Sequence, residues 1–481
     1  MQHRRTCDIT LAVVVARIRA LWERIDQALF YEASAVGLGV VGIWCVYWMA
    51  FYPAIVGWDP IDQLRQLHVG KLFDWHPIPH TLLIGAFVEV FGSVSALAFA
   101  QIAAAGAAYT VFYYRLASLG APRAALGVAA TWLALSPVFG TGLISIWKDS
   151  VFALGTLGMT LALLHITLSA RLGRGPFIGL TAAALVVAVV RHNGPVLVAC
   201  VFASCFVLMT RHRRPLAFCF LAVALIFPVV QITSSTLTVM PRHRSLTQQV
   251  LFHHVAAFVA DPAAEIPMDT AAALKAIMPR SEWEERYDCT SARDVMFDAG
   301  LTGRRLPSVT TTLRIWLDLA IRNPGILWRH SRCATRHLWL PGEPISVGPV
   351  LEGASVVTRA FDDELDIRTE SLWPAANRFL TDAVRSSYDA RLTRSLVWSP
   401  AVPLYATLLL TAVACRRQRS SWPLVVLLPA LLNTAIWFGL ASFPHIRFQF
   451  PLFLIAPLAV PLAALPRVAR ESVPRSDPAM S

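Results

Sequence analysis

Residues Gly57–His80, GWDPIDQLRQLHVGKLFDWHPIPH, separate the first long apolar segment of the chain from the second. The chain otherwise avoids charge, yet this stretch holds three carboxylates, two cations and three histidines: Asp59, Asp62, Asp74, Arg65, Lys71, His68, His76 and His80. Polar, irregular backbone at membrane depth persists only where protein buries it or where it lines a wet cavity. The stretch therefore predicts a membrane boundary and a functional site.

The composition is that of a polytopic membrane protein. Of 481 residues, 56% are hydrophobic and 15% are charged, whereas about 25% of the residues in an average soluble domain are charged. The net charge of +12 lies largely in short loops, where it reports orientation in the membrane. We therefore expect membrane lipids, and no nucleic acid, as partners.

Eleven apolar segments approach the length of about 20 residues that a membrane-spanning helix needs. They lie near 33–56, 77–91, 93–114, 124–145, 150–168, 176–191, 194–210, 216–239, 397–414, 422–441 and 449–465. The short basic loops between them, which the positive-inside rule places in the cytoplasm, are 115–123, 171–174, 211–214 and 416–419. This pattern predicts an all-α fold with ten crossings and both termini in the cytoplasm. Residues 77–91 then form a short tilted or re-entrant helix.

The same pattern predicts five regions. Residues 1–32 form a cytoplasmic N-terminus, in which an amphipathic interfacial helix is favoured over a cleaved signal peptide. The others are an N-terminal transmembrane module (33–239), an α-rich extracytoplasmic cap (240–396), C-terminal transmembrane helices (397–466) and a cytoplasmic tail (467–481).

The cap is predicted to contain amphipathic helices at 245–260, 309–322 and 324–340, and an acidic run at 361–370. The third helix carries Trp328 and Trp339, which we expect to pack on the membrane helices or lie at the interface. Cys289 and Cys333 could form a disulfide in an oxidising compartment. His253 and His254 are adjacent on a helix and point apart, which argues against a metal site there.

Four polar motifs fall on one predicted face, the face that also carries the cap. Besides the 57–80 stretch, they are IWKDS, RHNG and FPHIRF. Their ionisable or amide side chains are Lys148, Asp149, Arg191, His192, Asn193, His445 and Arg447. The cytoplasmic loops, by contrast, show only scattered arginines.

These residue types suit the handling of an anionic lipid. Lys148, Arg191 and Arg447 can neutralise a phosphate or pyrophosphate. Asp59 can accept a proton from an attacking hydroxyl, and Asp62 is the alternative base. Structural interpretations remain open beside these: a helix cap for Asp59, a turn at Asp74 and His76, a second helix cap at Asp149, interface anchors for the cations, and structural histidines at His192 and His445.

The motif W-D-x-x-x-Q followed by D-x-H-P-x-x-x-x-L-L, from Trp58 to Leu83, resembles the first external loop of the GT-C glycosyltransferase superfamily. Protein O-mannosyltransferases and aminoarabinose transferases have a comparable acidic loop, although here the second proline is displaced by one position and no paired acidic residues precede the helix. The KD turn, the R-x-N-G motif and the arginine before the last span resemble an uncharacterised bacterial branch.

This resemblance implies an inverting enzyme of the bacterial inner membrane. It would move a sugar from a polyprenyl-phosphate donor to a glycan, lipid or protein acceptor of the cell envelope. The position that matches the catalytic carboxylate is Asp59, and His76 matches the position before the prolines. Asp74, His76 and His80 would shape the donor pocket, with Asp149 and Asn193 orienting their neighbours. No cofactor is certain, and a divalent metal is possible.

Two other classes of function remain open on the sequence. A transporter or flippase of lipid-linked precursors would use the same cations for the same headgroup, but such proteins carry ionisable residues near the bilayer midplane. Here Glu89 and His165 are the main residues of that kind. A non-catalytic membrane partner in envelope assembly would use the cap for docking and would not need Asp59.

Overall fold

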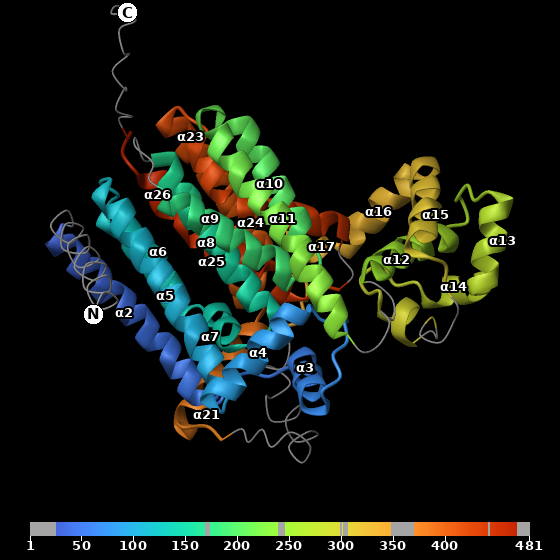
Figure 1. The fold of residues 1–481 in the computed structure, drawn as a ribbon, viewed down its shortest axis with the longest axis horizontal. Coiled ribbons are helices and arrows are strands. Elements are labelled where there is room, and N and C mark those ends of the chain that lie inside the picture. The colour runs from blue at the N-terminus through green and yellow to red at the C-terminus, as the bar shows by residue number, and fades with distance from the viewer. Residues whose placement is uncertain are drawn as a thin grey trace, which may run out of the picture.

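The computed structural model describes residues 26–168, 174–238, 246–298, 301, 306–347, 370–440 and 443–468. Across these residues the chain is helical, with four isolated β-bridges and no extended sheet. Most helices run side by side in one bundle, and a second, smaller group projects from it (Figure 1). The all-α prediction is confirmed.

Six helices of the described chain are long and apolar enough to cross a membrane. They are α2 (Gln27–Ala50), α5 (Ser95–Ser118), α8 (Lys148–Leu168), η1 with α11 (Thr210–Leu237), α24 (Trp422–Leu440) and η4 through α26 (Ile446–Ala464). Two bent pairs raise the number to eight if each is one span: α6 (Arg123–Leu135) with α7 (Pro137–Ile144), and α22–η3 (Arg391–Trp398) with α23 (Ala401–Gln418). The structure thus supports six to eight spans.

Three further apolar helices are shorter: α4 (Ile78–Phe91), α9 (Gly175–Val190) and α10 (Gly194–Leu208). Each of the eleven predicted apolar segments therefore contains a helix, but ten crossings remain a prediction. The short helix predicted at 77–91 is α4, which begins after Pro77 and ends at Gly92, where φ is +68°. The first span begins at Gln27, before the predicted boundary at residue 33. Of the predicted N-terminal region at 1–32, which was to contain the interfacial helix, residues 1–25 lie outside the described residues.

Helices α2 and α5 pack closely because glycine stands at their contact. A Cβ atom on Gly106 would collide with Val41, and one on Gly37 would collide with Thr110. Small residues at such positions let two helix backbones approach each other in a membrane. This contact also holds Trp44, which is fully buried and donates its indole N–H to the Leu133 carbonyl of α6 (3.0 Å).

The smaller group of helices lies within residues 240–396, the region predicted as the cap, and is called the cap below. It contains α12 (Leu246–Ala260), α13 (Met268–Ile277), α14 (Arg280–Arg286), α15 (Val309–Arg322) and α16 (Pro324–Ala334), followed by α17 (Arg336–Trp339). The three predicted amphipathic helices correspond to α12, α15 and α16–α17. They bury a core of their own around Phe252, Phe258 and Trp283. Trp328 contacts Phe438 of α24, and the Trp339 carbonyl accepts from Tyr405 of α23, so the cap meets the bundle there.

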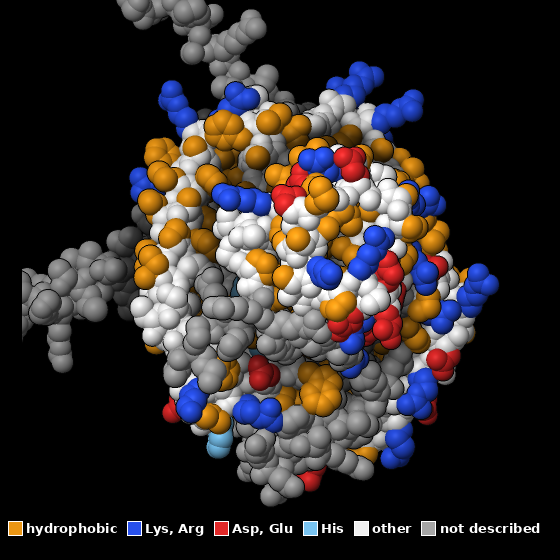
Figure 2. All heavy atoms as spheres, turned by 90° about the vertical axis from the view of Figure 1, so that its right-hand side faces the viewer, with side chains coloured by type: hydrophobic (Ala, Val, Ile, Leu, Met, Phe, Trp, Pro, Cys, Tyr) orange, Lys and Arg blue, Asp and Glu red, His pale blue; other side chains and the backbone are white. Residues whose placement is uncertain are grey.

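The surface of the cap mixes both signs of charge (Figure 2). Its ion pairs join Arg280 to Glu284, Arg286 to Glu282, Arg322 to Asp318 and Glu265, and Arg329 to Asp261. The last part of the predicted cap region contains α21 (Pro374–Asp389), which packs along α2 of the bundle. There Asn377 donates to the Ala50 carbonyl (2.8 Å). The acidic run at 361–369 lies outside the described residues.

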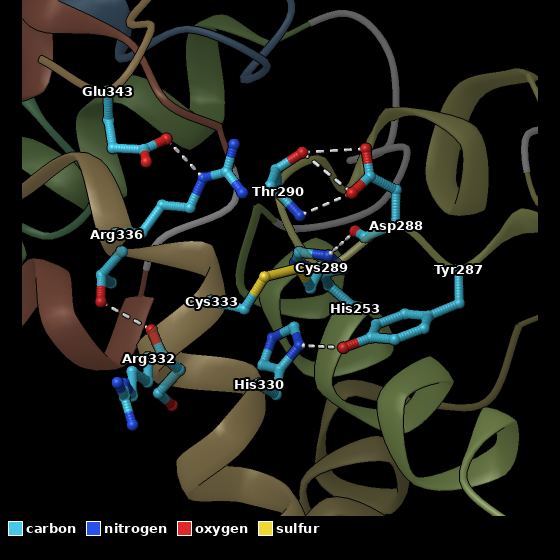
Figure 3. Close-up of a disulfide and its surroundings, with 12 residues drawn as sticks. His253, Tyr287, Asp288, Cys289, Thr290, His330, Arg332, Cys333, Arg336 and Glu343 are labelled. Carbon is cyan, nitrogen blue, oxygen red and sulfur yellow. Dashed lines mark hydrogen bonds and ion pairs between the residues drawn. A yellow bond between two sulfur atoms is a disulfide. The ribbon is translucent and has the colours of Figure 1, made fainter. Parts of the chain in front are cut away.

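A disulfide joins Cys289 to Cys333 and lies over a group of buried rings (Figure 3). His330 packs edge-on against His253 and His254 of α12, with ring centroids 4.5 and 4.7 Å away. His330 also shares a hydrogen bond with the Tyr287 hydroxyl (2.9 Å). Burial lowers the pKa of His254 to about 3 and that of His330 to about 2. Both rings are therefore neutral in the folded cap.

Enlarging Gly106 should loosen the α2–α5 contact. We expect Gly106→Leu to lower the free energy of unfolding by about 1–3 kcal/mol, as overpacking does. The readout is the midpoint of thermal unfolding in detergent. The matched control is Gly39→Leu, because a Cβ at Gly39 has no atom within 4 Å. Equal midpoints for the two variants would contradict this packing.

The cap should lose stability in acid. Below pH 6.5, the ordinary pKa of histidine, the unfolded cap binds protons that folded His254 and His330 do not. The loss therefore begins near pH 6.5 and grows as pH falls, at up to about 1.4 kcal/mol per pH unit for each ring. Hydrogen exchange of α12 and α16 at pH 7.5 and 5 measures it. His330→Phe should flatten the dependence and the exposed His68→Gln should not; an equal response to pH in wild type and His330→Phe would count against it.

Candidate functional site

Two main-chain contacts bring distant segments to one place. The Ile55 amide donates to the Ile144 carbonyl (3.1 Å), and the Ile146 amide donates back to the Ile55 carbonyl (3.1 Å). This pairing aligns the starts of α3 (Trp58–Val69) and α8. Asp59 lies in the first turn of α3 and Lys148 is the first residue of α8, so the pairing places them side by side.

The third segment is η4 (Ile446–Gln449), which carries Arg447. Its start pairs with the chain that leaves the cap: the Ser346 amide donates to Pro444 (2.7 Å), and the Ile446 amide donates to Ser346 (2.9 Å). His445 caps the turn, because its Nδ1 accepts from the Arg447 amide (3.3 Å). These contacts fix Arg447 toward Asp59.

One carboxylate oxygen joins the three segments. Asp59 Oδ2 lies 2.6 Å from Lys148 Nζ and 2.9 Å from Arg447 NH1. The three side chains are 22%, 11% and 20% exposed, so solvent still reaches them. Burial alone would raise the pKa of Asp59, but Lys148 and Arg447 outweigh it and hold that pKa well below its usual range. Asp59 is ionised whenever the two cations are.

Behind this group lies a buried ion pair. Arg191 NH1 is 2.5 Å from Asp149 Oδ1, and the two side chains are 6% and 1% exposed. The guanidinium is surrounded by the rings of Phe152, Trp437 and Phe448, whose centroids lie 5.1–5.4 Å away. Arg191 is therefore enclosed and already paired. It supports the site rather than offering a charge to a ligand.

His76 stands beside Asp59 and is almost fully buried. Its Nδ1 lies 3.3 Å from Lys148 Nζ, and its Nε2 lies 3.4 Å from Asp62 Oδ2. Asp62 also accepts from Gln66 (2.7 Å). Burial and then Lys148 lower the pKa of His76, although Asp62 opposes this, so the ring is neutral at pH 7. The hydrogen bond from His76 lowers the pKa of Asp62.

His80 holds helices together instead of facing the site opening. It is fully buried, and its Nδ1 contacts Gln63 Oε1 at 3.1 Å. Gln63 also donates to Thr81 (2.8 Å). These contacts join α3 to α4. The sequence predicted His80 as a pocket residue, and the structure places it one layer behind.

The remaining predicted residues, such as His192, Asn193 and His445, lie around the group of charged side chains rather than within it. His192 is exposed and interacts electrostatically with Asp74. Asn193 precedes α10, where a Cβ at Gly194 would collide with the Val187 carbonyl, so the turn requires glycine. Burial lowers the pKa of His445 to about 3, and its ring packs on Trp147. The R-x-N-G motif thus combines the buried Arg191 with a tight turn.

The part of the chain that the structure describes contains no group of three or more His, Cys, Asp or Glu side chains arranged to hold a metal ion. The two carboxylates of α3 face other partners: cations for Asp59, and His76 with Gln66 for Asp62. The arrangement can bind an anion through its two cations, and its neutral imidazole can accept a proton.

Comparison with known proteins adds one match. Residues 66–304 match the model of a family of unknown function, DUF6020. The match covers a little under half of the chain and includes Lys148, Asp149 and Arg191, but neither Asp59 nor Arg447. No curated protein and no solved structure matches the chain. Function must therefore be argued from the site.

Sequence reasoning brought Asp59, Lys148, His76 and Arg447 to one membrane face, and the structure places them in contact. It gave no role to Gln63, although that residue is part of the W-D-x-x-x-Q motif, and it missed Gln66; the two connect the site to α4 and the following loop. The available signal was that Gln63 lies four residues after Asp59 and Gln66 lies four residues after Asp62, since such residues share one helical face. The aromatic enclosure of Arg191 had no local signal.

Asp149→Asn should destabilise the fold strongly. It removes the charge that compensates the buried Arg191, a change that costs about 3–5 kcal/mol. The measurement is the unfolding midpoint in detergent. Adding Arg191→Met to Asp149→Asn should recover part of the loss, whereas Asp382→Asn, on the exposed face of α21, should change little. If Asp149→Asn and Asp382→Asn unfold alike, the pair does not carry this role.

Proposed function

We propose that the protein transfers a sugar from a polyprenyl-phosphate donor to an envelope acceptor at the outer face of the bacterial cytoplasmic membrane. The observation that carries the proposal is the sharing of Asp59 Oδ2 between Lys148 and Arg447. Two cations that converge on one partly exposed carboxylate oxygen can converge equally on a phosphate oxygen. A lipid phosphate is the anion that a site at a membrane boundary would meet.

Transfer from such a donor needs stabilisation of the leaving phosphate and removal of a proton from the acceptor hydroxyl. Lys148 and Arg447 would stabilise the charge that develops on the phosphate as its bond to the sugar breaks. Asp59, which the sequence predicted as the base, and His76 are the proton acceptors within reach. Attack from the face opposite the phosphate would invert the anomeric carbon.

A groove beside the charged site supports a lipid substrate. It has a volume of about 1030 Å³ and is lined by α3, α4 and the short segments that follow α2 and precede α5, mostly with apolar side chains such as Leu64, Leu67 and Val88. Asp59 and Asp62 lie on a different face of α3 from Leu64 and Leu67, because a residue advances 100° along a helix. One helix thus separates a site for a headgroup from a site for a chain.

The proposed topology has ten crossings with both termini in the cytoplasm, so that the cap and the site face outward. Two features of the cap support this orientation. The disulfide between Cys289 and Cys333 is of a kind that persists in oxidising compartments such as the bacterial periplasm. The ion-paired surface of α13–α16 suits water rather than lipid. The acceptor would meet the site beneath the cap.

The test is sugar transfer in proteoliposomes from radiolabelled polyprenyl-phosphate glucose, mannose, galactose and arabinose. We expect the wild type to release lipid phosphate and Lys148→Gln to reduce release at least 100-fold, because it removes a cation from the leaving group. The exposed Lys71→Gln, in the same polar stretch, should retain activity.

The other classes of function give other results in the same assay. Movement of the donor across the bilayer without lipid-phosphate release, in wild type and variants alike, would replace the proposal with a transporter or flippase. Neither transfer nor movement with any of the four donors would favour a non-catalytic partner in envelope assembly.

A further inference from the structure

The position of His76 fixes its tautomer. An ammonium group has only donors, so His76 Nδ1 must accept from Lys148 Nζ, 3.3 Å away. The ring proton therefore lies on Nε2, which faces Asp62 Oδ2 at 3.4 Å. A neutral imidazole with one nitrogen held by a carboxylate and the other directed at the reacting groups has the arrangement of a general base.

Asp59 is poorly suited to the same task. Its Oδ2 is held by both Lys148 and Arg447, and these cations keep its pKa well below the usual range. A group is an efficient base when its pKa lies near the working pH. The role that the geometry leaves to Asp59 is to hold the two cations in place until a substrate anion arrives.

We propose, on the basis of the proposed function, that His76 is the catalytic base, that Asp62 orients it, and that Lys148 masks it until the donor phosphate binds. In the free protein Lys148 donates to both Asp59 Oδ2 and His76 Nδ1. A phosphate oxygen is the stronger competitor for the ammonium because it is anionic and His76 is neutral. Binding of the donor thereby frees the lone pair of Nδ1.

The step balances. The proton of the acceptor hydroxyl passes to His76 Nδ1, and the hydroxyl oxygen forms a bond to the anomeric carbon of the sugar. The bond from that carbon to the phosphate oxygen breaks, and its electron pair stays on the phosphate, facing Lys148 and Arg447. The resulting imidazolium lies between Asp59 and Asp62, which stabilise its charge.

The groups that face His76 set its response to pH. They are Asp59 and Asp62 from α3, Lys148 from α8 and His80 from α4. Protonation of His76 would remove the base, so kcat/KM should fall as pH drops below 6.5, through the lowered pKa of this ring. A base at Asp59 would produce no such limb, because the pKa of Asp59 lies well below 3.8.

The experiment compares wild type, His76→Gln, Asp62→Asn and Asp59→Asn in the proteoliposome assay from pH 4.5 to 8.5. His76→Gln should lower kcat at least 100-fold with the KM for donor unchanged, and its residual rate should lack the acid limb. Asp62→Asn should lower kcat less and shift the limb, because the tautomer is no longer held. The control is His165→Gln, at the far end of α8, which should behave as wild type.

A second measurement does not depend on turnover. In full-length protein labelled with [¹³C]histidine, the His76 resonance, assigned by its loss in His76→Gln, reports the pKa of the ring. Farnesyl phosphate, a short polyprenyl monophosphate, should raise that pKa because Lys148 turns to the phosphate and an anion approaches. An unchanged His76 pKa at saturating farnesyl phosphate would overturn the masking by Lys148.

The results separate the two proposals. If wild type transfers sugar and His76→Gln transfers equally well, or keeps the acid limb, the assignment of His76 is wrong and the proposed function stands. If wild type transfers from none of the donors, the proposed function fails and the assignment of His76 as its base fails with it.

Discussion

Charge compensation at Asp59 holds the site together. One carboxylate oxygen contacts cations from α8 and η4, segments that lie 89 and 388 residues away in the sequence. Asp149 and Arg191 compensate each other one layer deeper. Charges removed from water are tolerated only when they are paired, so Asp59 and Asp149 each need their cations at this depth. The ion pairs that form the site therefore also hold the helix ends together.

The helices of this chain follow from local signals, whereas their bends do not. Apolar runs, Gly92 and the proline pairs predicted the extents of α4 and of the long spans. The segment predicted as one helix at 124–145 is divided at Ser136 into α6 and α7, which meet at 56°. Pro137 was the signal for a break, since a proline favours a helix start. The angle, however, depends on what α7 packs against, and the sequence pattern does not contain that.

The sequence predicted which residues gather at the candidate site, but not which cation pairs with which carboxylate. Basic loops alone placed four polar motifs on one face, because orientation is a property of the whole chain. Which cation meets which carboxylate depends on distances between helix ends. Arg191 shows the difference: Lys148, Arg447 and Arg191 look alike as helix-end cations, yet Arg191 is packed against both Trp437 and Phe448, more than two hundred residues away, and is only 6% exposed. Only the first two remain accessible to an anion.

The cap and the site are connected through the main chain. The strand-like segment that leaves the cap pairs at Ser346 with Pro444 and Ile446, on both sides of His445. Arg447 follows within one turn and contacts Asp59. Ser346 is hydrogen-bonded to the chain on both sides of His445, directly before Arg447. A movement of Ser346 would therefore also move Arg447. Arg447 shares an oxygen with Lys148, and Lys148 contacts His76. In the proposed reaction, an acceptor at the cap and a phosphate at the cations would therefore act on the same small set of charges.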